Sequence, residues 1–278
     1  MTVAGGGMLS DMLGEHVLVG YTDDAGGREA LALARTIAEV TGGRLTVATV
    51  HSPERAGSAV EAQATLARAA SALRDLRADL VTQESRGAGR GLSVLASKVN
   101  ADLIVIGSPR GGARGRIDLG GTGDHLMHGS TQAVMLTPAG YAPRERPQRL
   151  TVAYVRRPQC DEAVTQAAAA AVRLDVPLRL MTLAVNGADQ DVLRDDLALA
   201  IRLASDSSGL DTEEIQAQVG EGDDVAEAMA DGSWTEGDLL VCASSEDAPV
   251  HRVFLGETAF KMLRAAPCPV TVLPRGNV

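Results

Sequence analysis

Short apolar runs alternate with longer segments of helical periodicity along the whole chain. The runs are VLVG, LTVATV, LIVIG and AVML in the first half, and TVAYV, LRLMTLAV, DLLVC and PVTVL in the second. Continuous apolar runs of this length are typical of parallel strands that are buried on both faces. Strands that alternate with helices predict right-handed βαβ units around an open parallel sheet.

Several of the intervening segments carry apolar residues at helical spacing, which we interpret as faces that pack on the sheet. Three stripes are clear: Leu66, Leu73, Leu76 and Leu80; then Leu92, Leu95, Ala96 and Val99; then Leu193, Leu197, Ile201 and Ala204.

The chain contains the same pattern twice. An ungapped alignment that places Gly107 over Ala243 also matches Ser108 with Ser244, and it ends in both copies with an apolar run followed by proline. A nearly equal offset, with Gly20 over Ala153, aligns the start of each copy. A repeat of this length predicts two similar domains. The proline-rich segment PAGYAPRERPQ separates the copies and is typical of an extended connector. We therefore predict a flexible lead-in at 1–14, α/β domains at 15–140 and 149–278, and a linker at 141–148.

Composition narrows the classes of function. The net charge is −10 and aromatic residues make up 2% of the chain, which disfavours nucleic acid and anionic membranes as partners. The three cysteines form no CxxC pair, which favours a reducing compartment. The first residues do not match a signal peptide, and no apolar run approaches transmembrane length. We expect a cytoplasmic protein.

Three stretches carry a resemblance to a known family. They are the openings HVLVGYTDDAGGREALALA and RLTVAYVRRPQCDEAVTQAA, the block IVIGSPRGGARGRIDLGGTGDHLMHGSTQAVMLTP, and its twin LLVCASSEDAPVHRVFLGETAFKMLRAAPCPVTVLP. Each half resembles a universal stress protein domain, and the whole resembles the tandem form. The resemblance implies Rossmann-like domains (adenine nucleotide alpha hydrolase-like), each a five-stranded parallel sheet flanked by helices. It also implies intramolecular pairing of the domains through their last strands, with a further homodimer and an unknown protein partner left open.

The nucleotide-binding branch of that family carries the phosphate motif G-x2-G-x9-G-[ST]. Its glycines let backbone amides approach phosphate, and a hydroxyl and a helix N-terminus complete the anion site. In the first half the motif falls on Gly107, Arg110, Gly120 and Gly121, with Gly111 and Thr122 each one residue late; Ser108 lies beside it.

The adenine side of the family site falls on Gly20, Thr22 and Val50. Thr22 stands where the family has an adenine-holding Asp, although Asp23 is adjacent. From these departures from the family motif we expect a degenerate site in which small anions bind more readily than ATP, with Thr122 capping the following helix. An alternative is ATP or AMP binding in the first domain only.

In the second half the same positions carry Val155, Ala243, Glu246 and Glu257, followed or flanked by Asp247 and Pro249. Carboxylates repel phosphate and proline removes a backbone donor, so we expect this copy to have lost the site.

No pattern specifies catalysis. His51, His125 and His128 are candidate metal ligands, and His125 and His128 are three residues apart. No third ligand lies at a recognisable spacing from that pair, so we expect no metal site. The resulting interpretation is a non-catalytic stress-response or regulatory protein, with weak ATP hydrolysis left open. A distant alternative is an enzyme of the nucleotide-binding α/β class.

Overall fold

The computed structural model describes residues 13–73 and 76–276. The expected flexible lead-in at 1–14 lies mostly outside these residues. Gly14, at its end, is held in place, since its amide donates to Asp102 Oδ1 at 2.6 Å.

Strands and helices alternate through both copies. The first copy comprises β1 (His16–Gly20), α1 (Ala25–Thr41), β2 (Arg44–His51), α2 (Ser58–Ala72), β3 (Ala78–Glu84), α3 (Ala88–Val99), β4 (Leu103–Gly107), α4 (Gly120–Met127) and β5 (Ala133–Thr137). The second comprises β6 (Arg149–Ala153), α5 (Pro158–Leu174), β7 (Leu178–Val185), α6 (Gln190–Ser208), β8 (Gln216–Gly222), α7 (Val225–Ala230), β9 (Asp238–Ala243), α8 (Glu257–Ala265) and β10 (Val270–Leu273).

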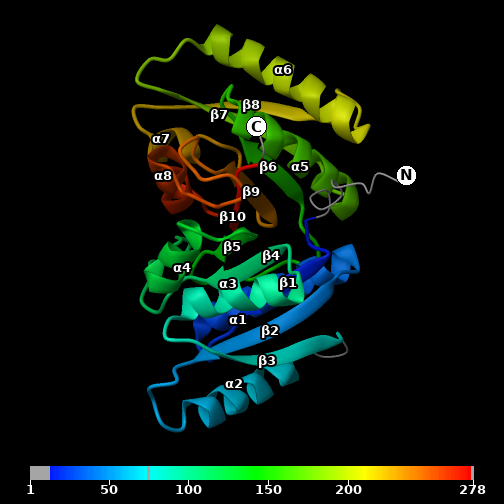
Figure 1. Cartoon of the computed structure of the whole chain (residues 1–278). Coiled ribbons are helices and arrows are strands. Elements are labelled where there is room, and N and C mark those ends of the chain that lie inside the picture. Colours follow the sequence, from blue (N-terminus) through cyan, green and yellow to red (C-terminus); the bar gives the residue numbers. More distant parts are fainter. Residues whose placement is uncertain (1–12, 74–75, 277–278) are drawn as a thin grey trace, which may run out of the picture.

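All the strands belong to one ten-stranded sheet with the order β3-β2-β1-β4-β5-β10-β9-β6-β7-β8 (Figure 1). Within each copy the five strands are parallel, which confirms the predicted α/β fold with a five-stranded parallel sheet per half. The two sheets are continuous because β5 and β10 pair in antiparallel register, with Thr271 opposite Met135. Each of these strands stops directly before a proline, Pro138 or Pro274, which cannot continue a ladder.

Helices cover both faces of this sheet. The core on one face includes side chains of α1, α2, α5 and α6. The core on the other face includes side chains of α3, α4, α7 and α8. The central strands are buried on both faces, which explains why they appear in the sequence as continuous apolar runs.

One helical stripe was predicted too long. Helix α2 ends at Ala72, whereas Leu80 lies in the edge strand β3 and is 41% exposed. The sequences ADLVTQE of β3 and QAQVGEG of β8 are mostly polar or partly exposed because each of these strands has a neighbour on one side only. Apolar-run counting therefore finds the inner strands and misses the edges.

The described part of the chain contains no helix with the length and apolar character needed to cross a membrane.

Candidate functional site

The strand order places a candidate cleft at the carboxyl ends of β1 and β4. The chain leaves β1 toward β2 on one side and reaches β4 on the other, and ligands of open α/β sheets bind at such a switch point. Gly20 ends β1, Val50 lies at the end of β2, and Gly107 ends β4. The structure thus brings the two sides of the candidate site to one edge of the sheet.

The loop after β1 uses its polar side chains within the protein. Asp24 caps α1, because its Oδ1 accepts from the amide of Gly27 at 2.9 Å. The exposed Thr22 donates its hydroxyl to the same oxygen at 3.0 Å. Asp23 is 2.6 Å from Arg68 Nε and 3.3 Å from Arg28 Nη1. The carboxylate adjacent to Thr22 is therefore held by two arginines and directed at helices α1 and α2.

Ser108 holds in place the loop of residues 108–119 between β4 and α4, which we call the strand-4 loop. Its side chain is 4% exposed, its hydroxyl donates to the carbonyl of Thr137 at 2.7 Å, and it accepts from the amide of Asp118 at 3.2 Å. Ser244 does the same in the second copy, where it donates to Leu273 at 2.6 Å and accepts from Phe254 at 3.1 Å. Since both copies keep this arrangement, the hydroxyl serves the loop fold in each.

Two of the candidate glycines are closely packed. A Cβ on Gly107 would lie 2.0 Å from the carbonyl oxygen of Gly26, at the start of α1. A Cβ on Gly20 would lie 2.7 Å from Leu92 of α3. Gly107 is glycine because the backbone of α1 approaches the strand end closely, a reason that needs no ligand, whereas the contact at Gly20 is with the end of a flexible leucine side chain. Sequence reasoning missed this cause, although the pair Gly26–Gly27 at the helix start is visible in the sequence.

The next two glycines are required by backbone conformation. Gly111 has φ +86° and Gly120 has φ +55°, both in the left-handed region. Gly121 differs, because it lies inside α4 and a Cβ there would meet nothing within 4 Å. Neither packing nor backbone conformation within the described chain explains why residue 121 is a glycine, and the space beside it is open.

Helix α4 begins with uncapped amides. The residue before it is Leu119, and no side chain accepts from its first turn. The expectation that Thr122 caps this helix is wrong: Thr122 lies within the first turn, two residues after Gly120, where the geometry of an N-cap is lost. Open first-turn amides beside Gly121 are the kind of donors that hold an anion.

Arg110 reaches from the strand-4 loop across to the loop after β1. Its Nε lies 3.6 Å from Asp24 Oδ2, its Nη2 donates to the carbonyl of Asp23 at 3.5 Å, and its side chain is 76% exposed. Both contacts are long and solvated, so they contribute little to stability and are readily exchanged for an anion.

The second copy has the same contact with the charges exchanged. In the repeat alignment Arg157 corresponds to Asp24 and Glu246 to Arg110, and Arg157 forms an ion pair with Glu246. The neighbouring contact is exchanged too, with Arg156 Nη1 3.2 Å from Asp196 of α6, as Asp23 contacts Arg68 of α2. The charge of Glu246 is thus partly balanced, which sequence reasoning missed because the partner lies in another loop.

The start of α8 also differs from that of α4. Gly256 precedes this helix, and the exposed Glu257 stands in its first turn. Glu257 Oε1 lies 2.7 Å from Lys261, which holds the pKa of the carboxyl below its usual value. The position that is open at Gly121 therefore carries a carboxylate in the second copy.

The remaining candidates lie elsewhere. His125 lies in α4, whereas His128 directly follows this helix and its Nδ1 donates to the carbonyl of Asp124 at 2.7 Å. Among the described residues, no three His, Cys, Asp or Glu form a group that could hold a metal ion. The cysteines Cys160, Cys242 and Cys268 are buried free thiols.

Comparisons with known proteins agree with this architecture. A family model described as the universal stress protein family matches residues 14–138 and 147–274. Universal stress protein Rv2319c of Mycobacterium tuberculosis is 32% identical over 289 residues, covering 93% of this chain and 99% of that protein. Universal stress protein Mb2346c of Mycobacterium bovis matches to the same extent.

Solved structures show a similar fold. A universal stress protein from Archaeoglobus fulgidus has a TM-score of 0.67 at 18% identity, over 97% of this chain and 99% of that one. A putative universal stress protein from Pseudomonas aeruginosa has a TM-score of 0.66 at 17% identity, over 93% and 92% of the two chains. At these identities the likeness extends to the fold alone.

Proposed function

The chain belongs to the universal stress protein family and carries two such domains, and we propose that it is a non-catalytic stress-response protein. In this proposal the cleft of the first domain binds small anions, and it binds adenine nucleotides weakly. The second domain binds neither.

One observation carries the proposal: at the adenine position, the loop after β1 offers a hydroxyl in place of a carboxylate, and the adjacent carboxylate is engaged by arginines. Thr22 donates its hydroxyl to Asp24, and the carboxylate of Asp23 is held by Arg28 and Arg68. An adenine amino group needs an acceptor, and a hydroxyl already used as a donor to a carboxylate is a poor replacement for an aspartate.

The phosphate side of the cleft keeps groups that can bind an anion. The first turn of α4 has no side-chain cap, and the space beside Gly121 is open. Arg110 lies nearby in the same loop and supplies a guanidinium that pairs well with phosphate oxygens. A site that keeps its anion donors and loses its base acceptor favours phosphate or sulfate over ATP.

In the second domain the corresponding helix begins with Glu257, and Arg157 is occupied by Glu246. A carboxylate at the first turn of α8 competes with any anion for the amides and for the helix dipole. This supports the proposal that the second domain is silent.

The alternative of ATP or AMP binding in the first domain is favoured by the long contact of Arg110 with Asp24. A 3.6 Å ion pair between partly exposed groups is easily exchanged for a phosphate. This alternative differs from the main proposal in affinity, and titration separates the two.

The test combines extraction of nucleotide from freshly purified protein with calorimetric titration of phosphate and ATP. We expect no stoichiometric nucleotide, a dissociation constant of about 1 mM for phosphate, and weaker binding of ATP. Arg110→Gln should weaken both about threefold, the size of an exposed ion pair. Arg114→Gln, in the same loop, is the matched control and should change neither. A nucleotide that co-purifies at one per chain, or phosphate binding that Arg110→Gln leaves intact, would refute the proposal.

A further inference from the structure

The seam between the two domains follows an approximate twofold symmetry in its main contacts. Arg116 Nη1 donates to the carbonyl of Ala265 at 2.7 Å, and Arg252 Nη1 donates to the carbonyl of Gly129 at 2.7 Å. In the alignment that places Gly107 over Ala243, Arg116 corresponds to Arg252 and Gly129 to Ala265. These are the same contact made twice, once on each side of the β5–β10 pair.

The backbone beside these arginines breaks the symmetry. On one side the amides of Val253 and Leu255 donate to the carbonyls of Ser130 and Met127, at 2.8 and 3.0 Å. Within the described chain, the corresponding amides of Ile117 and Leu119 make no backbone bond to the opposite helix. The loop before α8 is thus bonded through its backbone to the end of α4, and we call this the closed side of the seam. The loop before α4 makes no such backbone bond to α8 within the described chain.

The side chains differ in the same way. On the closed side, Phe254 packs edge-on against His128, with ring centroids 5.2 Å apart. On the other side the aligned residues are Asp118 and Arg264, whose Oδ1 and Nη2 atoms are 4.0 Å apart. A short carboxylate therefore stands where the closed side has a phenyl ring.

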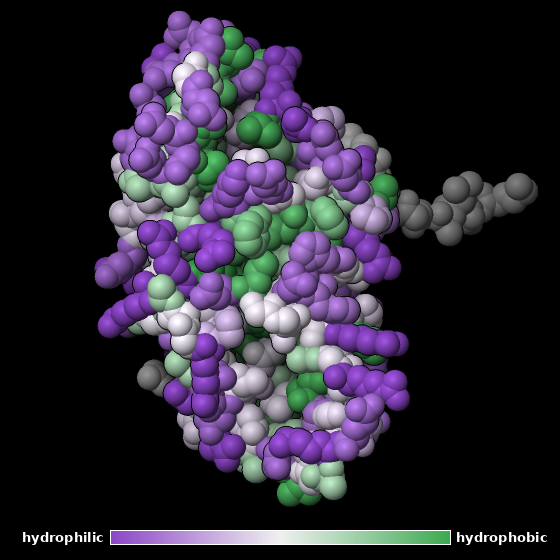
Figure 2. All heavy atoms as spheres, turned by 90° about the vertical axis from the view of Figure 1, so that its left-hand side faces the viewer, coloured by the Kyte–Doolittle hydropathy of each residue, from purple (hydrophilic) through white to green (hydrophobic). Residues whose placement is uncertain are grey.

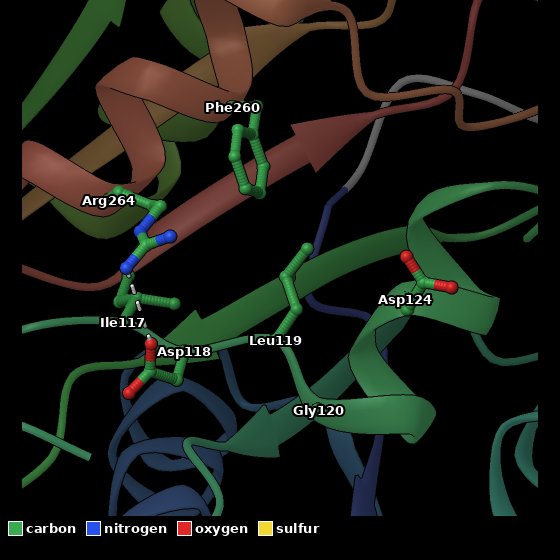
Figure 3. A pocket seen from close by; sticks show the side chains of 7 residues that line it. All are labelled: Ile117, Asp118, Leu119, Gly120, Asp124, Phe260 and Arg264. Atoms are coloured by element: carbon green, nitrogen blue, oxygen red, sulfur yellow. Dashed lines mark ion pairs between the residues drawn. The ribbon is translucent and has the colours of Figure 1, made fainter.

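A pocket of about 330 Å³ lies where that ring is missing. We call it the seam pocket; its lining includes Asp118, Leu119, Asp124, Phe260 and Arg264. Figure 3 shows Phe260 of α8 and Leu119 on facing walls, with Asp118 near Arg264 and Asp124 at the other end. The volume is at the lower end of the range for small-molecule sites.

Aromatic residues are rare in this chain, and two of them lie at the seam. The sequence contains two phenylalanines, and Phe254 and Phe260 both lie at this seam with 36% and 37% exposure. Figure 2 shows a group of apolar residues at mid-height on the side of the molecule that carries α4 and α8 in Figure 1. An exposed ring beside a pocket offers a face for another flat group.

The charges of the pocket favour a cation. Asp118 and Asp124 against Arg264 give a formal balance of −1, and Lys261 beside the pocket is already paired with Glu257. Arg264 balances Asp118 and lies 5.9 Å from the Phe260 ring centre. Asp124, whose Oδ1 lies 3.4 Å from His128 Nδ1, stands in the end of the pocket away from this arginine and is the carboxylate that an ammonium group would meet.

We propose that the seam pocket binds a small monocation with a flat apolar body, of the arylalkylammonium class. The ring lies between Phe260 and Leu119, in the place that corresponds to the Phe254 ring. The ammonium group lies beside Asp124. The pocket borders the proposed anion cleft, since Gly120 at the start of α4 also lines it. Its ring and ammonium positions do not depend on the function proposed above.

The test is a nuclear magnetic resonance titration of the full chain with three probes that share a phenyl ring. They are 2-phenylethylammonium, the neutral 2-phenylethanol and the anion phenylacetate. We expect the ammonium probe to bind about three- to fivefold more tightly than the alcohol, the size of an exposed ion pair, and phenylacetate to bind more weakly still. The shifts should centre on residues 117–124 and 260–264.

Two variants separate the ring from the charge. Asp118→Phe fills the pocket as Phe254 fills its counterpart and should abolish binding of all three probes. Asp124→Asn should remove the preference for the ammonium probe and leave the alcohol unchanged. Asp195→Asn, an equal change of charge at an exposed position of α6, is the control and should have no effect.

Asp124→Asn carries the test on its own if Asp118→Phe fails to fold. The proposal is overturned if the three probes bind equally, if Asp124→Asn keeps the preference, or if the shifts lie elsewhere.

Discussion

The buried hydroxyls of Ser108 and Ser244 provide the sharpest test of whether the strand-4 loop is built for ligand or for fold. Ser108→Ala removes the donor to the Thr137 carbonyl and the acceptor for the Asp118 amide, at a site that is 4% exposed. Ser244→Ala removes the equivalent pair at 3% exposure. Each change leaves buried polar groups without partners, which costs about 1–3 kcal/mol.

The expected loss is therefore about 2 kcal/mol in each variant, and about 2–4 °C of melting temperature per kcal/mol for a chain of this size. Thermal unfolding and urea titration measure it. Ser71→Ala is the control, because the Ser71 hydroxyl donates to Arg68 within an exposed helical turn and its loss should change stability by less than about 0.5 kcal/mol. If Ser108→Ala leaves stability unchanged and abolishes phosphate binding, the hydroxyl is a ligand group and our account of the loop is wrong.

Three further outcomes follow from the buried parts of the fold. Gly107→Ala should lower stability by more than about 3 kcal/mol, measured by urea unfolding, since its Cβ would lie 2.0 Å from the Gly26 carbonyl oxygen; a stable, fully folded variant would show that α1 can move. Burial, and then the charge of Arg44, lower the pKa of His16, so the unfolded chain binds a proton more readily. Stability is therefore full above pH about 6.5 and falls below it, and His16→Gln should flatten this part of the urea-midpoint profile against pH; an unchanged slope would contradict the assignment. The three thiols, of which burial raises the pKa of Cys242 to about 12, should react with a thiol reagent only after unfolding, and labelling of the native protein within minutes would contradict their burial.

The sequence predicts the inner part of the fold well. Runs such as LIVIG and AVML are apolar throughout because β4 and β5 are buried on both faces, and the repeat alignment is reproduced in the two five-stranded halves. The edge strands β3 and β8 escape prediction because one side of each has no neighbour, so their sequences are polar and show no continuous run.

The candidate site is predictable in its location and less so in its causes. Motif spacing selects Gly107, Gly120 and Gly121, which lie at the end of β4 and at the start of α4 in the structure. Motif spacing does not show that residue 107 must be glycine because Gly26 lies so close to it. Nor does it show that Asp23 forms ion pairs with Arg28 and Arg68. These causes depend on contacts between segments far apart in the chain, and single-sequence patterns contain no distances.

The same limit explains the exchanged ion pairs and the seam pocket. The alignment shows Asp118 over Phe254 and Arg110 over Glu246. The effect of each difference depends on a contact with a residue of another element, which the sequence does not show. The positions at which the two halves differ are therefore the ones that distinguish the ion pairs and the seam contacts of the two domains.

The most direct test of the central claim, that the first domain has lost its adenine acceptor, is calorimetric titration of ATP into Thr22→Asp. We expect the unmodified protein to bind ATP with a dissociation constant above about 1 mM, more weakly than phosphate, and Thr22→Asp to bind ATP at least about tenfold more tightly with unchanged affinity for phosphate. Val155→Asp, at the aligned position of the second domain, is the control and should gain nothing, because Glu257 occupies the first turn of α8. Tight ATP binding by the unmodified chain, at one site or two, would contradict the claim, and so would a Thr22→Asp variant that gains no affinity.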